Sequence, residues 1–302
     1  MDRAYHNPFV TPHTPFAAAW ESLPTVIRNP LNYLVRMTYI VSVEAMTVLM
    51  HAIPAKLTWL WRLHVERNIQ SMVVLGTVDK VTKAAYLYQQ SPLKVTTGEK
   101  IRPVLTCHGD YGDPSNLLPQ ANLAQKAGLP TFSLYMPIIH VEAEHDHNVA
   151  LLEAAIEKIK SLIQSKGGIF DGVLMIGHSS GGILAAKLQF VDSSDPSTVP
   201  SIRATCAIGS RLNSIIDDDC KEVIIRKIVR EVHSKIQQKP DLPLVQIVGQ
   251  EDWNAPQEVM MVRRGPDCHS VPGMHLSCLY QPETMEYVAK FLVDYQAGRA
   301  AS

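Results

Sequence analysis

The serine at residue 179 lies in a setting that could activate it as a nucleophile. It is the centre of the sequence Gly177-His178-Ser179-Ser180-Gly181, which has the form G-x-S-x-G. An apolar run precedes this motif and an alanine-rich run follows it, so we expect Ser179 at a turn from a strand into a helix. Side chains two residues away would crowd a nucleophile on such a sharp turn, which explains Gly177 and Gly181. The alternative is a serine that only caps the helix.

A base and an acid follow this serine in chain order. A serine of ordinary acidity is a poor nucleophile; it needs a base, and the base needs an orienting acid. Asp252 follows the end of the apolar run PLVQIVG, and His275 lies in a loop before the last predicted helix. Glu251 is the rival acid and His269 the rival base; position relative to the strand ends favours the first pair. The predicted triad is Ser179, Asp252 and His275.

Acyl transfer also requires N–H donors for the oxygen that becomes negatively charged. The backbone N–H of Ser180, which follows the nucleophile, is the first predicted donor. The second is expected from the segment CHGDYGDP, where Gly109 ends an apolar run and allows the backbone to approach a substrate closely. We assign this second donor to the N–H of Asp110, with Tyr111 as the alternative.

The pattern of apolar segments predicts an α/β fold from residue 101 onward. Strands that are buried on both faces are continuously apolar, and their alternation with helices indicates a parallel sheet. We therefore predict a mostly parallel central sheet with helices on both faces, its reactive residues lying after the carboxyl ends of strands. The predicted strands are PVLTCHG, PTFSLYMP, GVLMIG, IRATCAIG and PLVQIVG. The helices between them are NLLPQANLAQKAG, NVALLEAAIEKIKSLIQ and DDCKEVIIRKIVREVHSKI.

The chain is predicted to contain two regions of different character. Residues 1–100 form an N-terminal arm and an apolar helical region, and residues 101–302 form the catalytic domain. The helical region extends from about residue 31 to about residue 90. Its role is left open between a layer packed on the domain, a lid and a membrane-surface contact.

The segment MTYIVSVEAMTVLMHAI, residues 37–53, contains a single charged residue, Glu44. It is borderline in length for a membrane span, for which about 20 apolar residues are needed. Pro54 is expected to end this helix, and two tryptophans among basic residues follow. Such a mixture is found at bilayer interfaces, so peripheral membrane contact through residues 31–70 is an alternative to packing.

The overall composition excludes several classes of protein. With 28 Lys and Arg against 29 Asp and Glu, the chain has no basic surplus for nucleic acid. Its five cysteines are scattered, which indicates reduced thiols rather than a disulfide framework or zinc site. The acidic and histidine-rich segment 138–149 lacks a recognised ligand spacing, and we interpret it as a helix start. No metal site and no cofactor are predicted, and the expected location is cytoplasmic, with membrane association if the helical region binds lipid.

The segments HGDYGDP, GHSSGG, GQEDWNAP and PGMHLSCLYQPE, in this order and spacing, resemble the α/β-hydrolase superfamily, in the style of small lipases and esterases. The resemblance covers about two-thirds of the chain, from residue 101 onward. It implies a Ser-Asp-His triad, an oxyanion hole, no metal and no redox cofactor. The first 100 residues depart from the family, since its usual opening antiparallel strands are not identifiable there.

The expected activity is the hydrolysis of carboxylic esters by a serine hydrolase through an acyl-enzyme. So much apolar sequence beside the site favours a small-molecule or lipid-like ester as the partner, as in a lipase or carboxylesterase. A thioesterase or an acyltransferase would use the same acyl-enzyme. The alternative from another class is a non-catalytic binding or scaffold protein on a hydrolase fold, because fold alone does not fix function.

Overall fold

A computed structural model provides the fold of the chain. The chain forms two compact units, Met1–Met50 and His51–Ser302. In the first unit, residues 41–47 are helical, and the Thr47 hydroxyl donates a hydrogen bond of 2.9 Å to the Val43 carbonyl. The structure describes residues 38, 41–78, 81–110, 112–136, 145–192, 201–213, 223–250, 252 and 267–296.

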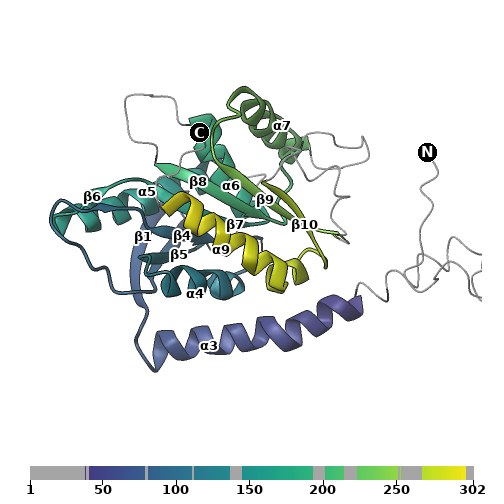
Figure 1. Ribbon diagram of the computed structural model, residues 1–302, viewed down its shortest axis with the longest axis horizontal. Coiled ribbons are helices and arrows are strands. Elements are labelled where there is room, and N and C mark those ends of the chain that lie inside the picture. Colours follow the sequence, from purple (N-terminus) through teal and green to yellow (C-terminus); the bar gives the residue numbers. More distant parts are fainter. Residues whose placement is uncertain are drawn as a thin grey trace, which may run out of the picture. The chain divides into compact units, whose positions relative to one another are not determined.

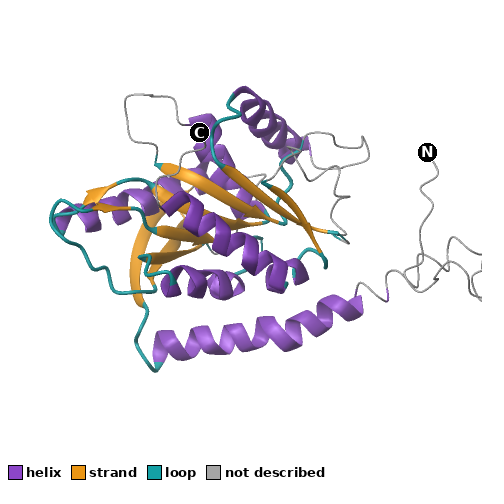
Figure 2. Cartoon of the chain, viewed as in Figure 1, coloured by secondary structure: helices purple, strands orange, loops and turns teal. Residues whose placement is uncertain are grey.

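The second unit alternates strands and helices along most of its length (Figures 1 and 2). Its strands are β1 (Gln70–Val78), β2 (Val81–Gln89), β3 (Lys100–Ile101), β4 (Val104–Cys107), β5 (Thr131–Tyr135), β6 (Ile169–Phe170), β7 (Val173–His178), β8 (Ile202–Ile208), β9 (Leu244–Gly249) and β10 (Cys268–Val271). Its α-helices are α3 (Ile53–His64), α4 (Leu118–Lys126), α5 (His145–Ser165), α6 (Ser180–Lys187), α7 (Val223–Gln238) and α9 (Pro282–Gln296). Shorter helical turns are η2 (Pro114–Leu117), η3 (Leu188–Asp192) and η4 (Ser277–Tyr280), while η1 (Val48–Ala52) contains the boundary between the two units.

One sheet of eight strands organises this unit, in the order β1-β2-β5-β4-β7-β8-β9-β10. Strand β2 is antiparallel to both of its neighbours, and every other neighbouring pair is parallel. This topology confirms the predicted fold class. The five predicted strands after residue 101 are all present, because strands buried on both faces require continuous apolar side chains.

The expectation of helix up to residue 90 is wrong for the residues of β1 and β2. These strands pair in register from Gln70↔Gln89 to Val78↔Val81, so they form a hairpin at the edge of the sheet. The opening antiparallel strands that the sequence seemed to lack are therefore present. The compact unit that contains them begins at His51, whereas the predicted domain boundary lies at residue 101.

Helix α3 precedes this hairpin and packs on the same unit through one face. Pro54 was expected to end a helix; instead it lies in the first turn of α3, where its missing N–H is not needed. Trp59 is buried and packs with Ile69 and Leu118, and its ring meets that of Tyr88 edge-on at 5.2 Å. Within the described residues, no helix is both long and apolar enough to cross a membrane.

Helices cover both faces of the sheet (Figure 1), and the side chains of β7 alternate between the two faces. Val173 and Met175 pack with residues of α5 and α6. Leu174 and Ile176 point to the opposite face and pack with residues of α4 and α9. All four side chains are fully buried. The nucleophile motif therefore follows a strand that is fixed from both sides.

At the amino-terminal ends of the strands, opposite to this motif, Asp171 is bound by two arginines. Arg102, before β4, and Arg203, in β8, each donate a hydrogen bond to a carboxylate oxygen of Asp171. Burial opposes ionisation of this carboxyl group, but the hydrogen bonds from Arg203 and Arg102 outweigh it and lower its pKa. The ion pairs thus connect three neighbouring strands.

This lowered pKa predicts a stability that depends on pH. A carboxyl with a folded pKa below its unfolded value of about 4 stabilises the protein above that pH. The contribution is lost as the pH falls through the folded pKa. We expect Asp171→Asn to lower the free energy of unfolding by about 1 kcal/mol at neutral pH, a modest value because the site is partly open to solvent. The loss should be smaller in acid, where the wild-type carboxyl is itself protonated. Urea unfolding at neutral and acidic pH measures this difference; Asp294→Asn, which removes an exposed pair with Lys290, is the control.

Candidate active site

Ser179 connects β7 to α6 through a strained backbone conformation. Its φ of 51° and ψ of −124° are unusual for a residue with a side chain. Although Ser179 occupies the N-cap position of α6, its side chain makes no capping hydrogen bond. The hydroxyl lies 3.0 Å from Nε2 of His275 instead. The interpretation of Ser179 as a simple helix cap is therefore not supported.

The glycines around the motif are required by close backbone contacts. A Cβ added at Gly181 would lie 2.4 Å from the carbonyl oxygens of Cys107 and His108, which end β4. A Cβ at Gly177 would lie 2.5 Å from the next turn of the motif, and one at Gly109 would lie 2.7 Å from Cβ of Ser179. All three predicted glycines thus allow the strand ends and the turn to approach each other. Their role is steric.

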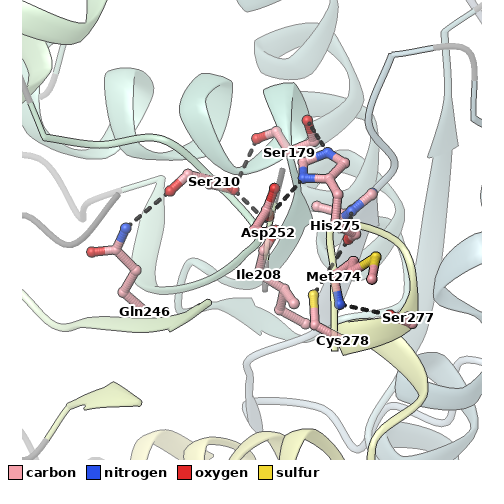
Figure 3. A network of polar contacts seen from close by, with 10 residues as sticks. Ser179, Ile208, Ser210, Gln246, Asp252, Met274, His275, Ser277 and Cys278 are labelled. Atoms are coloured by element: carbon pink, nitrogen blue, oxygen red, sulfur yellow. Dashed lines mark hydrogen bonds and ion pairs between the residues drawn. The ribbon is translucent and has the colours of Figure 1, made fainter. Parts of the chain in front are cut away.

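The structure brings the three predicted triad residues together (Figure 3). Nδ1 of His275 lies 3.0 Å from Oδ2 of Asp252, and Nε2 lies 3.0 Å from the Ser179 hydroxyl. The Asp252 side chain is completely buried, and a buried carboxylate favours an N–H donor, so Nδ1 carries the proton. Nε2 is then free to accept the serine proton. This geometry can activate Ser179 by general-base catalysis.

The rival residues have different positions. His269 lies in β10, and its ring stacks on Tyr287 with centroids 3.6 Å apart, which indicates a structural role. Burial lowers the pKa of its imidazole. Glu251, the rival acid, and Tyr111, the alternative oxyanion donor, lie outside the described residues.

The loop after β4 lies beside the first turn of α6. The backbone N–H of Asp110 donates a hydrogen bond of 3.0 Å to the Ser180 hydroxyl. Ser180 is the first residue of α6, so its N–H is among those that find no carbonyl partner within the helix. The residues of the two predicted oxyanion donors are therefore neighbours on adjacent segments, at the positive end of a helix dipole. The Asp110 N–H is donated to the Ser180 hydroxyl here, so it can serve an oxyanion only when that bond opens.

Two residues that the sequence did not single out support the strained turn (Figure 3). The Ser210 hydroxyl donates a hydrogen bond of 2.8 Å to the Ser179 carbonyl, and Gln246 donates one of 2.9 Å to the Ser210 carbonyl. Ser210 follows the end of β8, the neighbour of β7, so its place at a strand end was the available signal. These bonds connect the turn to β8 and β9.

His178, the variable residue before the nucleophile, contacts the proposed base. Its Nε2 lies 3.1 Å from the His275 carbonyl oxygen, which requires Nε2–H as donor, and the two rings lie 4.9 Å apart. Burial, together with the nearby charge of His275, lowers the pKa of His178 to about 3. A neutral His178 holds the His275 backbone without placing a second positive charge beside that ring.

A second histidine, His108, shapes the oxyanion loop. Its Nε2 accepts a hydrogen bond of 3.2 Å from the Met136 N–H, so Nδ1 carries the proton and donates to the Gly109 carbonyl at 2.7 Å. Burial lowers the pKa of this imidazole. The neutral ring therefore fixes the path of the loop immediately before Asp110.

Further along the same loop, Asp113 connects to α3. Its carboxylate accepts hydrogen bonds from the Ser115 N–H at 2.8 Å and from Lys56 of α3. Burial opposes ionisation of Asp113, but hydrogen bonds from Lys56 and Ser115 outweigh it and lower the carboxyl pKa. Lys56 thus ties the loop to a helix that precedes the whole sheet, a contact without any signal in the sequence.

A cleft of about 470 Å³ lies between this loop and α3. Helix α3 contributes Trp59, Leu60 and Leu63, and β2 and β5 contribute Tyr88 and Tyr135. The Lys56–Asp113 ion pair lies among these side chains, and the lining exposes more polar than apolar surface. The cleft is lined by Lys56, Trp59, Leu60, Leu63, Tyr88, Gly112, Asp113, Pro114 and Tyr135.

The structure offers little for metal or redox chemistry among the residues it describes. No cluster of three or more metal-binding side chains occurs there, while most of the segment 138–149 lies outside them. The described cysteines, Cys107, Cys206, Cys268 and Cys278, are free thiols. Burial raises the pKa of Cys107 to about 12, so this thiol beside the site stays protonated.

Comparison with known proteins matches the fold to esterases. Esterase 2 from Thermogutta terrifontis, in its apo form, superimposes with a TM-score of 0.56 at 20% identity, over 78% of this chain and 97% of that one. Est1E from Butyrivibrio proteoclasticus gives a TM-score of 0.52 at 17% identity, over 75% and 99%. Neither a family model nor a curated protein sequence matches the chain. By its topology and these structural neighbours, the chain has the α/β-hydrolase fold of esterases.

Proposed function

We propose that the protein is a serine hydrolase that cleaves carboxylic esters through an acyl-enzyme. The observation that carries the proposal is the continuous hydrogen-bonded chain from Asp252 through His275 to Ser179, with both contacts at 3.0 Å. The esterase fold supports it, and one neighbour, Thermogutta terrifontis esterase 2, is known in a form phosphoramylated by tabun.

In the proposed mechanism, His275 takes the Ser179 proton while Oγ attacks the ester carbonyl. Asp252 keeps the imidazole oriented and stabilises its charged form. The Ser180 N–H stabilises the oxyanion of the tetrahedral intermediate, and the Asp110 N–H joins it when its hydrogen bond to the Ser180 hydroxyl opens. His275 then gives its proton to the leaving alcohol, and the acyl group remains on the serine. A water molecule, deprotonated by His275, attacks this acyl-enzyme and releases the acid.

The preferred substrate is proposed to be an ester with an apolar, lipid-like group. In the cleft beside the oxyanion loop, Trp59, Leu63, Tyr88 and Tyr135 can contact an alkyl chain, and the Lys56–Asp113 ion pair can contact a polar part of the same substrate. Each methylene that enters such an environment gains about 0.8 kcal/mol. We therefore expect kcat/KM to increase with the length of the alkyl chain until the chain fills the cleft.

The experiment that tests this function is a series of p-nitrophenyl esters from acetate to decanoate. We expect kcat/KM to rise about two- to fourfold per methylene and then level off. Leu63→Trp, which narrows the cleft, should reduce activity on the long esters at least about tenfold and leave acetate nearly unchanged. The matched control is Leu57→Trp, on the exposed side of the same helix. A preference for acetate over all longer esters would contradict the lipid-like substrate.

A further inference from the structure

Helix α3 exposes an apolar face that the described part of its own unit does not cover. Ile53, Leu57, Trp61 and Val65 recur at a spacing of four residues, so they share one side of the helix. Their exposed fractions are 44%, 61%, 54% and 56%. Side chains of this kind are costly to leave in water, and a continuous row of them indicates a surface for interaction.

The opposite face of the helix is fixed to the rest of the unit. Trp59 is buried against Ile69 and Leu118, Arg62 donates a hydrogen bond of 2.8 Å to Asn122, and Lys56 pairs with Asp113. These contacts determine which side chains of α3 point outward. The apolar row is therefore held in place on a packed helix.

The charges of the helix favour one kind of partner. Helix α3 contains Lys56, Arg62 and His64 but no Asp or Glu. Trp61 is exposed near its carboxyl end, and its indole N–H donates a hydrogen bond of 2.9 Å to Glu66. A helix with apolar residues and a tryptophan on one side and basic residues on its other side is typical of a bilayer interface. Lys56 is already paired with Asp113, so Arg62 is the remaining permanent cation of the helix. No helix of the described residues combines the length and the apolar character of a membrane span, so a contact with the bilayer surface is the mode considered.

We propose that the exposed face of α3 docks on the surface of a lipid bilayer, with anionic lipids strengthening the contact. The helix would lie along the surface, with Leu57 and Trp61 among the acyl chains and Arg62 on the side of the helix that packs on the protein. Leu60 lines the cleft and is also partly exposed on the outer side of the helix. If the proposed function holds, docking brings the cleft to the surface where lipid-like esters are found; the docking itself does not depend on that function.

The test is flotation of the full-length protein with vesicles of phosphatidylcholine, with and without phosphatidylglycerol. We expect binding that increases with the anionic lipid and weakens about tenfold or more when Leu57→Glu and Trp61→Glu are combined. The matched control is Val293→Glu, which adds a charge at an equally exposed apolar position, 63%, on α9. This control should bind vesicles like the wild type, and thermal unfolding should show all variants folded.

Three results would overturn the proposal: wild-type protein that floats with neither vesicle, a double variant that binds as well as the wild type, or a wild-type dimer that the double variant abolishes without any vesicle binding. The last result would assign the face to a second copy of the chain. Hydrolysis of a short soluble ester is measured in the same samples. Loss of that activity in every sample would contradict the proposed function, while the vesicle result would still decide the docking.

Discussion

Replacing Ser179 by alanine is expected to reduce kcat/KM for ester hydrolysis by roughly 10⁴- to 10⁶-fold. The hydroxyl oxygen forms the acyl-enzyme, and no described neighbour could replace it in the same position. The Ser180 hydroxyl is engaged by the Asp110 N–H, and that of Ser210 by the Ser179 carbonyl. The measurement is steady-state hydrolysis of a p-nitrophenyl ester, with initial rates followed at high enzyme concentration.

The variant should fold normally, because alanine fits wherever serine does and the Ser179 side chain makes no capping contact. Removal of a strained residue's hydroxyl should leave thermal unfolding nearly unchanged. Ser201→Ala, at an exposed position before β8, is the matched control and should keep full activity. Activity in Ser179→Ala close to that of this control would show that another residue is the nucleophile.

Replacing Asp252 by asparagine should have the second largest effect, a loss of about 10⁴-fold in kcat. An amide at this position can present its NH₂ group to Nδ1 of His275, which would favour the tautomer with the proton on Nε2. That tautomer cannot accept the Ser179 proton. Because Asn occupies almost the same volume as Asp, KM should change little and the loss should appear in kcat.

Glu251→Gln is the matched control for this change, since it removes the neighbouring carboxylate in the same way. It should retain activity, whereas Asp252→Asn should not. The reverse pattern would assign the orienting role to Glu251 and would contradict the hydrogen bond between Asp252 and His275. The pair of variants thus separates two acids that are adjacent in the chain.

The sheet after residue 101 could be predicted from the sequence because each of its parallel strands is buried on both faces. Such strands consist of uninterrupted apolar residues, as in the segment that becomes β7. The hairpin of β1 and β2 could not be predicted in this way. Only Asp79 and Lys80 stand between the strands, and a two-residue connection usually contains glycine, so the expected hairpin signal is missing.

The triad could be predicted because its members follow strand ends in a recognisable order, although they are far apart in sequence. The supporting contacts could not. Ser210 and Gln246 act through backbone and side-chain hydrogen bonds that depend on strand register, and the Lys56–Asp113 pair joins segments separated by 57 residues. Such contacts arise only when the elements are packed.

The resulting arrangement connects the oxyanion loop to three different parts of the fold. The hydrogen bond between Asp110 and Ser180 joins it to α6, His108 joins it to the end of β5, and Lys56 joins it to α3. These contacts hold the Asp110 N–H close to α6, and its hydrogen bond to the Ser180 hydroxyl has to open before it can bind an oxyanion. Helix α3 therefore contributes to the same loop whose N–H groups are proposed to bind the oxyanion.

Labelling of the purified protein with a fluorophosphonate, followed by intact mass and peptide mapping, tests directly whether Ser179 is activated. We expect one adduct per chain, on Ser179, which is absent in Ser179→Ala and forms much more slowly in His275→Ala. His269→Ala should label like the wild type. No adduct, with or without detergent, or an adduct on a different serine, would contradict an activated Ser179 and would favour a binding protein on a hydrolase fold.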